Sequence, residues 1–159
     1  NVATYARMAY TDMMTGLGNR AAFQRDSAAD ASFGGALAYV MIDANNLKVI
    51  NDSMGHHRGD ELLLQIAACL KRALGQKMSG YRLGGDEFAV RLKDVSQLET
   101  EAFAEALRRE IAAADAQNEL TISAAIGYAW TDCNPKDPEV LLHQADNAMY
   151  EIKKQMKKQ

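Results

Sequence analysis

Three acidic residues hold positions that suit metal-dependent chemistry. Asp43 ends a run of apolar residues, while Asp86 and Glu87 directly follow two glycines. If the strand that ends at Asp43 and the turn that carries the other two acids are neighbours in one sheet, the three carboxylates meet at one place. Carboxylates that lie close together repel one another, and a bound cation is the usual means of neutralising them. Hard oxygen ligands select magnesium or manganese.

The glycines before these acids are Gly84 and Gly85. They leave room for a bulky group such as a triphosphate to approach the backbone. A Gly-Gly-Asp-Glu run taken by itself is more often an exposed turn with solvated acids. Its interpretation therefore depends on the rest of the chain.

The elements that must position these residues follow from the hydrophobic pattern. A continuous apolar run predicts a buried strand over 36–42, and apolar residues at even positions predict a strand over 120–130 with one buried face. A hairpin has its tip at 84–87, and a loop covers 54–59. Helices are predicted over 19–29, 45–53, 60–74 and 98–114, with a weakly helical start over 2–8.

The order of these elements favours an α+β fold. Asp137 and Pro138 mark the start of a last helix, with the aspartate as N-cap. The order then is α-α-β-α-α-β-β-α-β-α. Because a hairpin sits in the middle, a mostly antiparallel central sheet flanked by helices fits better than a doubly wound parallel sheet. The 159 residues suit a single domain, with 1–11 as a helical lead-in from an upstream region.

Composition narrows the partners and the compartment. The net charge of −3 argues against a surface that coats nucleic acid, which would be basic. No apolar run approaches the roughly 18 residues that span a bilayer, so we expect no membrane contact by this domain. Two cysteines are too few for a disulfide scaffold, and a cytoplasmic setting is expected. The chain opens on Asn1 rather than Met, as a piece excised from a longer protein would.

Four blocks of sequence stand out along the chain. Gly-Gly-Asp-Glu-Phe occupies 84–88 and follows Tyr-Arg-Leu at 81–83. A second block runs from Asp43 to Asp60, another is Thr-Gly-Leu-Gly-Asn-Arg at 15–20, and the last lies in the closing helix over 145–153. These blocks resemble the motifs of the GGDEF domain family, follow the family order and span about residues 12 to 157, which makes a chance resemblance very improbable.

The resemblance implies a fold and a reaction. The expected core is like that of nucleotidyl cyclases and polymerase palm domains. Two Mg²⁺ ions, with Mn²⁺ as a possible substitute, would be held by Asp43, the carbonyl of Ala44, Asp86 and Glu87. The reaction would be that of a diguanylate cyclase, in which the 3′-hydroxyl of one GTP attacks the α-phosphate of a second and pyrophosphate leaves. Either signature acid could assist deprotonation.

The resemblance also implies nucleotide contacts. Asn51 and Asp60 match the positions that read guanine, and a carboxylate can accept from guanine N1–H and the 2-amino group. The alternative for Asp60 is the N-cap of the following helix. Basic residues expected at the triphosphate are Lys48, Lys153 and Lys157, and the substrate-binding set also includes Asn46, Leu47, Gly84 and Gly85. Without the resemblance, the lysines of the last helix would be a solvated end that complements the helix dipole.

Several positions depart from the family pattern. Asn45 stands where a second acid is usual, Leu47 replaces a phenylalanine, and Met156 begins a variant ending in place of Gly-Arg-Asn. Many family members carry an inhibitory product site, Arg-x-x-Asp, five residues before the signature. Gly75 and Met78 hold its first and last positions here, so that site is expected to be absent.

Three other functions are alternatives to the diguanylate cyclase hypothesis. A catalytically silent GTP-binding or regulatory module would keep the fold without turnover. A pure dimerisation scaffold would leave the acids solvated. A cyclase for an adenine-containing product would conflict with Asp60. The cyclase reading further expects a homodimer, weak in this fragment, and an upstream sensor or regulatory region.

Overall fold

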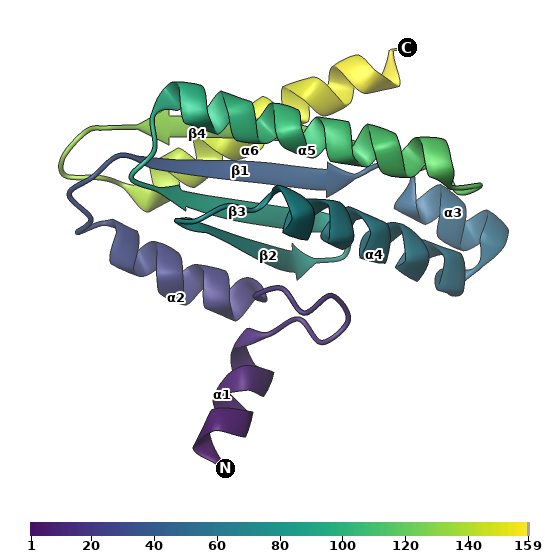
Figure 1. The fold of residues 1–159 in the computed structure, drawn as a ribbon, viewed down its shortest axis with the longest axis horizontal. Helices are drawn as coiled ribbons and strands as arrows, with labels where there is room; N and C mark the ends of the chain where they lie inside the picture. The colour runs from purple at the N-terminus through teal and green to yellow at the C-terminus, as the bar shows by residue number, and fades with distance from the viewer. Residues whose placement is uncertain (159) are drawn as a thin grey trace.

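A four-stranded antiparallel sheet forms the centre of the molecule (Figure 1). The structure is a computed structural model that describes residues 1–158. The strands are β1 (Leu37–Ala44), β2 (Met78–Gly84), β3 (Glu87–Lys93) and β4 (Ala124–Thr131). Their order across the sheet is β2-β3-β1-β4, so β1 is paired on both sides. The arrangement is the β-α-β-β-α-β pattern of split βαβ folds, and the predicted α+β class is confirmed.

Helices cover both faces of the sheet. Their bounds are α1 (Val2–Tyr10), α2 (Arg20–Asp30), α3 (Leu47–Met54), α4 (His56–Ala73), α5 (Gln97–Gln117) and α6 (Pro138–Lys157). In Figure 1, α4 and α5 lie in front of the sheet and α6 lies behind it. Alternate residues of β1 enter two separate cores: Val40 and Ile42 pack with α4 and α5, whereas Tyr39 and Met41 pack with α2 and α6. This two-sided burial explains the continuous apolar run of β1.

Helix starts follow local capping chemistry. The Asp137 side chain accepts from the backbone N–H groups of Glu139 and Val140, which confirms the predicted start of α6. Ser96 and Glu99 form a reciprocal capping box at α5. Both contacts involve only neighbouring residues, but only the Asp137 cap was predicted from the sequence.

The predicted order of ten elements is confirmed, but two boundaries were wrong. The expected loop over 54–59 is helical from His56, because Gly55 alone separates α3 from α4 with a left-handed φ of 88°. The strand expected over 120–130 begins only at Ala124. Leu120 and Ile122 are buried in the core before the strand starts, so their alternation reports burial rather than strand pairing.

Among the described helices, α1 packs least against the rest of the chain. None of its residues is buried, and Figure 1 shows it beyond α2 at the edge of the molecule. Arg25 of α2 stacks 4.1 Å from the centre of the Tyr10 ring, which ties the end of α1 to the domain. Within residues 1–158, no helix has the length and apolar character required to cross a bilayer.

Candidate nucleotide and metal site

Strand pairing brings the acidic residues to one end of the sheet. Asp43 lies opposite Glu87 in the β1–β3 register. The next residue, Ala44, donates its backbone N–H to the carbonyl of Asp86 at 2.8 Å. The ends of two strands therefore bring together the four residues that were predicted as metal ligands. These form two adjacent pairs, at 43–44 and 86–87, that lie more than forty positions apart in sequence.

The turn between β2 and β3 depends on its glycines. Gly84 and Gly85 have φ values of 142° and 49°, which side chains with a Cβ rarely adopt. Arg82 donates from Nε and Nη2 to the carbonyl of Gly85, at 3.1 and 2.8 Å. The same guanidinium bonds to Asp12 at 3.1 Å. A partly buried ion pair thus fixes the turn that presents Asp86.

Asp43 is the most perturbed acid of this cluster. It is only 8% exposed, and burial raises its pKa to about 6, helped by the negative charge of Asp86. Lys153 of α6 opposes that rise by donating to Asp43 Oδ2 at 2.5 Å. Partial burial lowers the pKa of Lys153, but the three carboxylates Asp43, Asp86 and Glu87 together outweigh burial and leave that pKa raised.

The acidic cluster fits a hard divalent cation. Asp43 Oδ1 is buried and has no hydrogen-bond partner, which is costly unless a cation or water satisfies it. Asp86 lies near enough to influence the Asp43 carboxyl directly. Within residues 1–158, however, no three His, Cys, Asp or Glu side chains are arranged as a ready-made metal cluster. Glu87 instead faces Arg20, with 3.9 Å between Oε2 and Nη2.

A cavity of about 300 Å³ lies beside this cluster. Its lining residues come from the segment just after β1, the residue just before β4 and the last turns of α6: Asn45, Asn46, Ser123, Lys153, Met156 and Lys157. Three of these were predicted substrate-binding residues. Asn45 donates to Ser123 Oγ at 2.9 Å and contacts Met156 Sδ at 3.4 Å, which ties the segment after β1 to α6. Asn46 has a left-handed φ of 71° and directly precedes α3, which begins at Leu47.

The predicted guanine-reading residues meet at the α3–α4 corner. Asn51 of α3 packs against Gly59 so closely that a Cβ at position 59 would lie 1.8 Å from Asn51 Oδ1. That oxygen is buried without a partner. Asp60, the next residue along, is exposed and is the fifth residue of α4. The N-cap interpretation of Asp60 is therefore wrong. Lys48 is exposed on α3.

The comparisons with known proteins agree on one family. The profile described as "Diguanylate cyclase, GGDEF domain" matches residues 9–159. This chain belongs to the GGDEF domain family. It is 39% identical to diguanylate cyclase DgcN of Escherichia coli over 162 residues, which covers 96% of this chain and 39% of DgcN. Cyclic di-GMP phosphodiesterase PdeR of the same organism is 33% identical over 150 residues, or 92% of this chain and 23% of PdeR.

Solved structures place this GGDEF domain in the same fold. The GGDEF domain of TpbB from Pseudomonas aeruginosa superposes with a TM-score of 0.81 at 35% identity, covering 92% of this chain and 90% of that one. The recognised family is confirmed. The chain spans less than half the length of the two curated relatives named above, so their activities as whole proteins do not transfer to it directly.

One residue of the site escaped prediction from sequence. Arg20, the first residue of α2, donates from Nε to the carbonyl of Leu83 at 3.1 Å and also faces Glu87. It supports both the strand end and the acid of the GGDEF turn. Its presence in the block at 15–20 was the available signal, but nothing local relates that block to residues more than sixty positions away.

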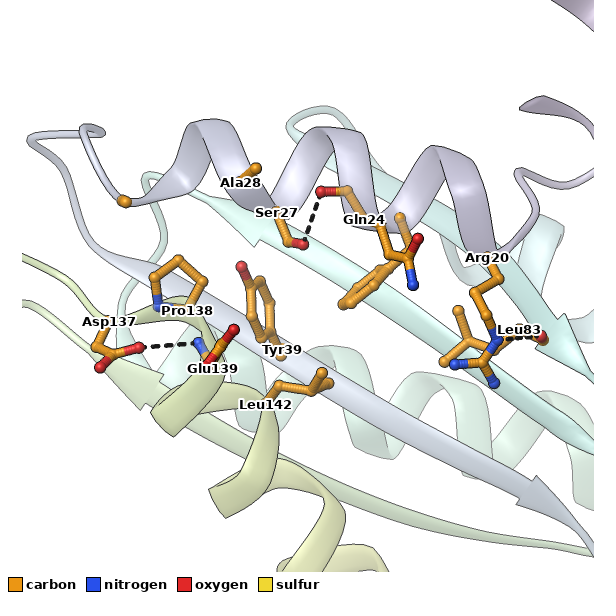
Figure 2. A pocket seen from close by; sticks show the side chains of 12 residues that line it. Arg20, Gln24, Ser27, Ala28, Tyr39, Leu83, Asp137, Pro138, Glu139 and Leu142 are labelled. Atoms are coloured by element: carbon orange, nitrogen blue, oxygen red, sulfur yellow. Dashed lines mark hydrogen bonds between the residues drawn. The ribbon is translucent and has the colours of Figure 1, made fainter. Parts of the chain in front are cut away.

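A larger cavity, of about 600 Å³, lies between α2 and the start of α6. Figure 2 shows the Tyr39 ring between these helices, with Arg20 and Leu83 at the far end. Of its acids, Asp137 is engaged in capping α6. The cavity touches the acidic cluster only through Arg20, so the smaller cavity beside Asp43 is the better candidate for phosphate chemistry.

Proposed function

We propose that this GGDEF domain is a diguanylate cyclase that condenses two GTP molecules into cyclic di-GMP and two pyrophosphates. The observation that carries the proposal is the buried, half-satisfied carboxylate of Asp43 beside Asp86, next to a cavity with lysines on its wall. An acid that needs a cation and a basic pocket for phosphates are the two requirements of metal-assisted phosphoryl transfer. Relatives named diguanylate cyclases support the same function.

The chain's residues divide between the base and the phosphates of GTP. Lys153 and Lys157 would bind the triphosphate in the smaller cavity, where Asn46 and Leu47 offer backbone groups at the start of α3, and Lys48 adds charge. At the α3–α4 corner, the Asn51 amide and the Asp60 carboxylate would hold guanine. Burial of Asn51 Oδ1 fixes that side chain against Gly59, so base recognition begins from an ordered amide.

The metal ligands in this proposal are Asp43, the carbonyl of Ala44, Asp86 and Glu87. Mg²⁺, or Mn²⁺ in its place, would supply charge neutralisation and activation of the attacking oxygen when bound. The chain contributes the rest of the environment. Gly84 and Gly85 leave open space at the turn, since a Cβ at either would meet no atom within 4 Å. Either Asp86 or Glu87 would accept the proton of the attacking hydroxyl in this proposal.

Catalysis in this proposal requires two copies of the domain. One domain holds one GTP, and the product joins two of them head to tail, so a twofold homodimer must face the two sites toward each other. The exposed lead-in helix α1 suits a connection to an upstream sensor or regulatory region. A cytoplasmic location, where GTP and Mg²⁺ are present, is part of the same proposal.

The second candidate is a catalytically silent GTP-binding or regulatory module. It is favoured by the similarity to a relative named as a phosphodiesterase rather than a cyclase. The intact signature acids favour the cyclase.

One incubation separates the two candidates. The domain, at several protein concentrations, is mixed with GTP and Mg²⁺, and the nucleotides are resolved by chromatography. We expect cyclic di-GMP in the wild type and a loss of at least about 100-fold in Asp86→Asn, the scale of removing a major electrostatic contact from a transition state. Asp132→Asn, an exposed acid in the loop after β4, is the matched control and should retain activity. GTP binding without any product would establish the silent module instead.

A further inference from the structure

Lys153 is placed against the acid that a metal ion would need. Its Nζ donates to Asp43 Oδ2 at 2.5 Å, and both side chains are largely buried, at 23% and 11% exposed. The other oxygen of Asp43 has no partner. One ammonium group therefore neutralises part of the site but leaves one oxygen of this carboxylate unsatisfied.

The ammonium group lies at the acidic cluster. It bonds to Asp43, which pairs with Glu87 in the β1–β3 register, and the neighbouring Ala44 N–H bonds to the carbonyl of Asp86. A divalent ion at these carboxylates would occupy the same electrostatic position. Because like charges repel, the ion and the ammonium group cannot both sit against Asp43 without cost.

The same lysine also borders the cavity proposed for the triphosphate. Lys153 and Lys157 are one helical turn apart on α6 and line that cavity together. A lysine side chain is a point charge on a flexible four-carbon stem. Its ammonium group can therefore exchange a carboxylate on one side for a phosphate on the other without any movement of the helix.

We propose that Lys153 is a built-in counter-ion for the metal carboxylates, which competes with the divalent ion for Asp43 and turns to the triphosphate when nucleotide binds. The inference rests on the proposed function for the identity of that nucleotide. Its consequence is cooperativity. GTP removes the competitor of the metal, the metal releases the phosphate-binding lysine, and each ligand strengthens the other by the same factor.

If Lys153 has this role, removing its charge should strengthen metal binding and weaken nucleotide binding, and the test measures both affinities. Mn²⁺ alone, without nucleotide, is titrated into the domain and followed by calorimetry and by its electron paramagnetic resonance. A separate titration in Mg²⁺ uses 3′-deoxy-GTP, which lacks the attacking hydroxyl and so cannot react. In Lys153→Met we expect Mn²⁺ alone to bind about tenfold more tightly and 3′-deoxy-GTP about tenfold more weakly, each equivalent to ~1.4 kcal/mol.

Lys157→Met is the matched control. Lys157 lines the same cavity as Lys153, but it is Lys153 that donates to Asp43. It should weaken 3′-deoxy-GTP binding and leave the affinity for Mn²⁺ alone unchanged. Lys153→Gln guards against a folding defect in the methionine variant, since an amide can still donate to Asp43 without a charge. Circular dichroism melts check both. Unchanged or weaker Mn²⁺ binding in folded Lys153→Gln or Lys153→Met overturns the proposal.

The outcome is independent of turnover. If Mn²⁺ affinity rises in the variants but the wild type makes no cyclic di-GMP from GTP, the counter-ion role stands and the cyclase proposal fails. If the wild type makes the product and the variants bind Mn²⁺ no more tightly, the counter-ion role alone fails.

Discussion

Replacing Asp43 by asparagine should stabilise this GGDEF domain in a chelating buffer at neutral pH while removing its proposed metal ligand. Burial raises the Asp43 pKa from its ordinary 3.8 to about 6, so the fold favours the protonated form. The cost of ionising it in the folded protein is absent below pH ~3.8, grows as the pH rises toward ~6, and is then constant. An uncharged asparagine avoids that cost.

The size of this ionisation cost follows from the difference of about two units between the folded and ordinary pKa values of Asp43. Each pKa unit is equivalent to ~1.4 kcal/mol. The full cost is thus about 3 kcal/mol at pH ~7.5 and about 1 kcal/mol at pH ~4.5. Lys153 loses its anionic partner in the variant, which reduces the gain, so we expect about 1–3 kcal/mol at the higher pH. In a domain of this size, 1 kcal/mol moves the midpoint of thermal unfolding by roughly 2–4 °C.

The assay is thermal and urea unfolding of wild type and Asp43→Asn at both pH values with chelator present. Asp132 is an exposed acid outside the cluster, so Asp132→Asn serves as the control and should show no gain in stability. The stabilisation should shrink as the pH falls, and added Mg²⁺ should stabilise only the wild type. A variant less stable than wild type at pH ~7.5, or a gain that grows toward low pH, would refute the reasoning.

Three further predictions concern the nucleotide site. Asp60→Ala should lower the preference for GTP over ATP by about 1–3 kcal/mol, measured by competition binding, because guanine donors lose their acceptor. Gly59→Ala should destabilise the fold by about 1–3 kcal/mol in urea unfolding and weaken GTP binding, since the new Cβ would lie 1.8 Å from Asn51 Oδ1. Cyclic di-GMP should inhibit only in competition with GTP, because Gly75 and Met78 stand at the Arg and Asp positions of the inhibitory product site and neither carries a charge; the Gly75 N–H instead contacts Met78 Sδ at 3.3 Å. Inhibition kinetics at rising GTP concentration check this, and inhibition that excess GTP cannot relieve would contradict it.

The sequence alone predicted the element order, the N-cap of α6 and the family. The physical reason is that these features are local. The continuous apolar run of β1, the helical spacing of apolar residues in α5, the Asp137-Pro138 start of α6 and the signature at 84–88 each involve residues within a few positions of one another. Local patterns failed where the same residues were compatible with two different local structures. A glycine-rich stretch at 54–59 fitted a loop, yet Gly55 alone makes the turn and the helix α4 resumes at His56.

Only the tertiary structure decided which charges meet. The β1–β3 register sets Glu87 opposite Asp43, and packing of α6 on β1 and β4 carries Lys153 to the same carboxylate from 110 positions away. The approach of Arg20 to Glu87 likewise depends on where α2 docks. Such encounters depend on how the two faces of the sheet bury their apolar residues, and electrostatic energies depend on distance and burial, which no spacing in the chain encodes.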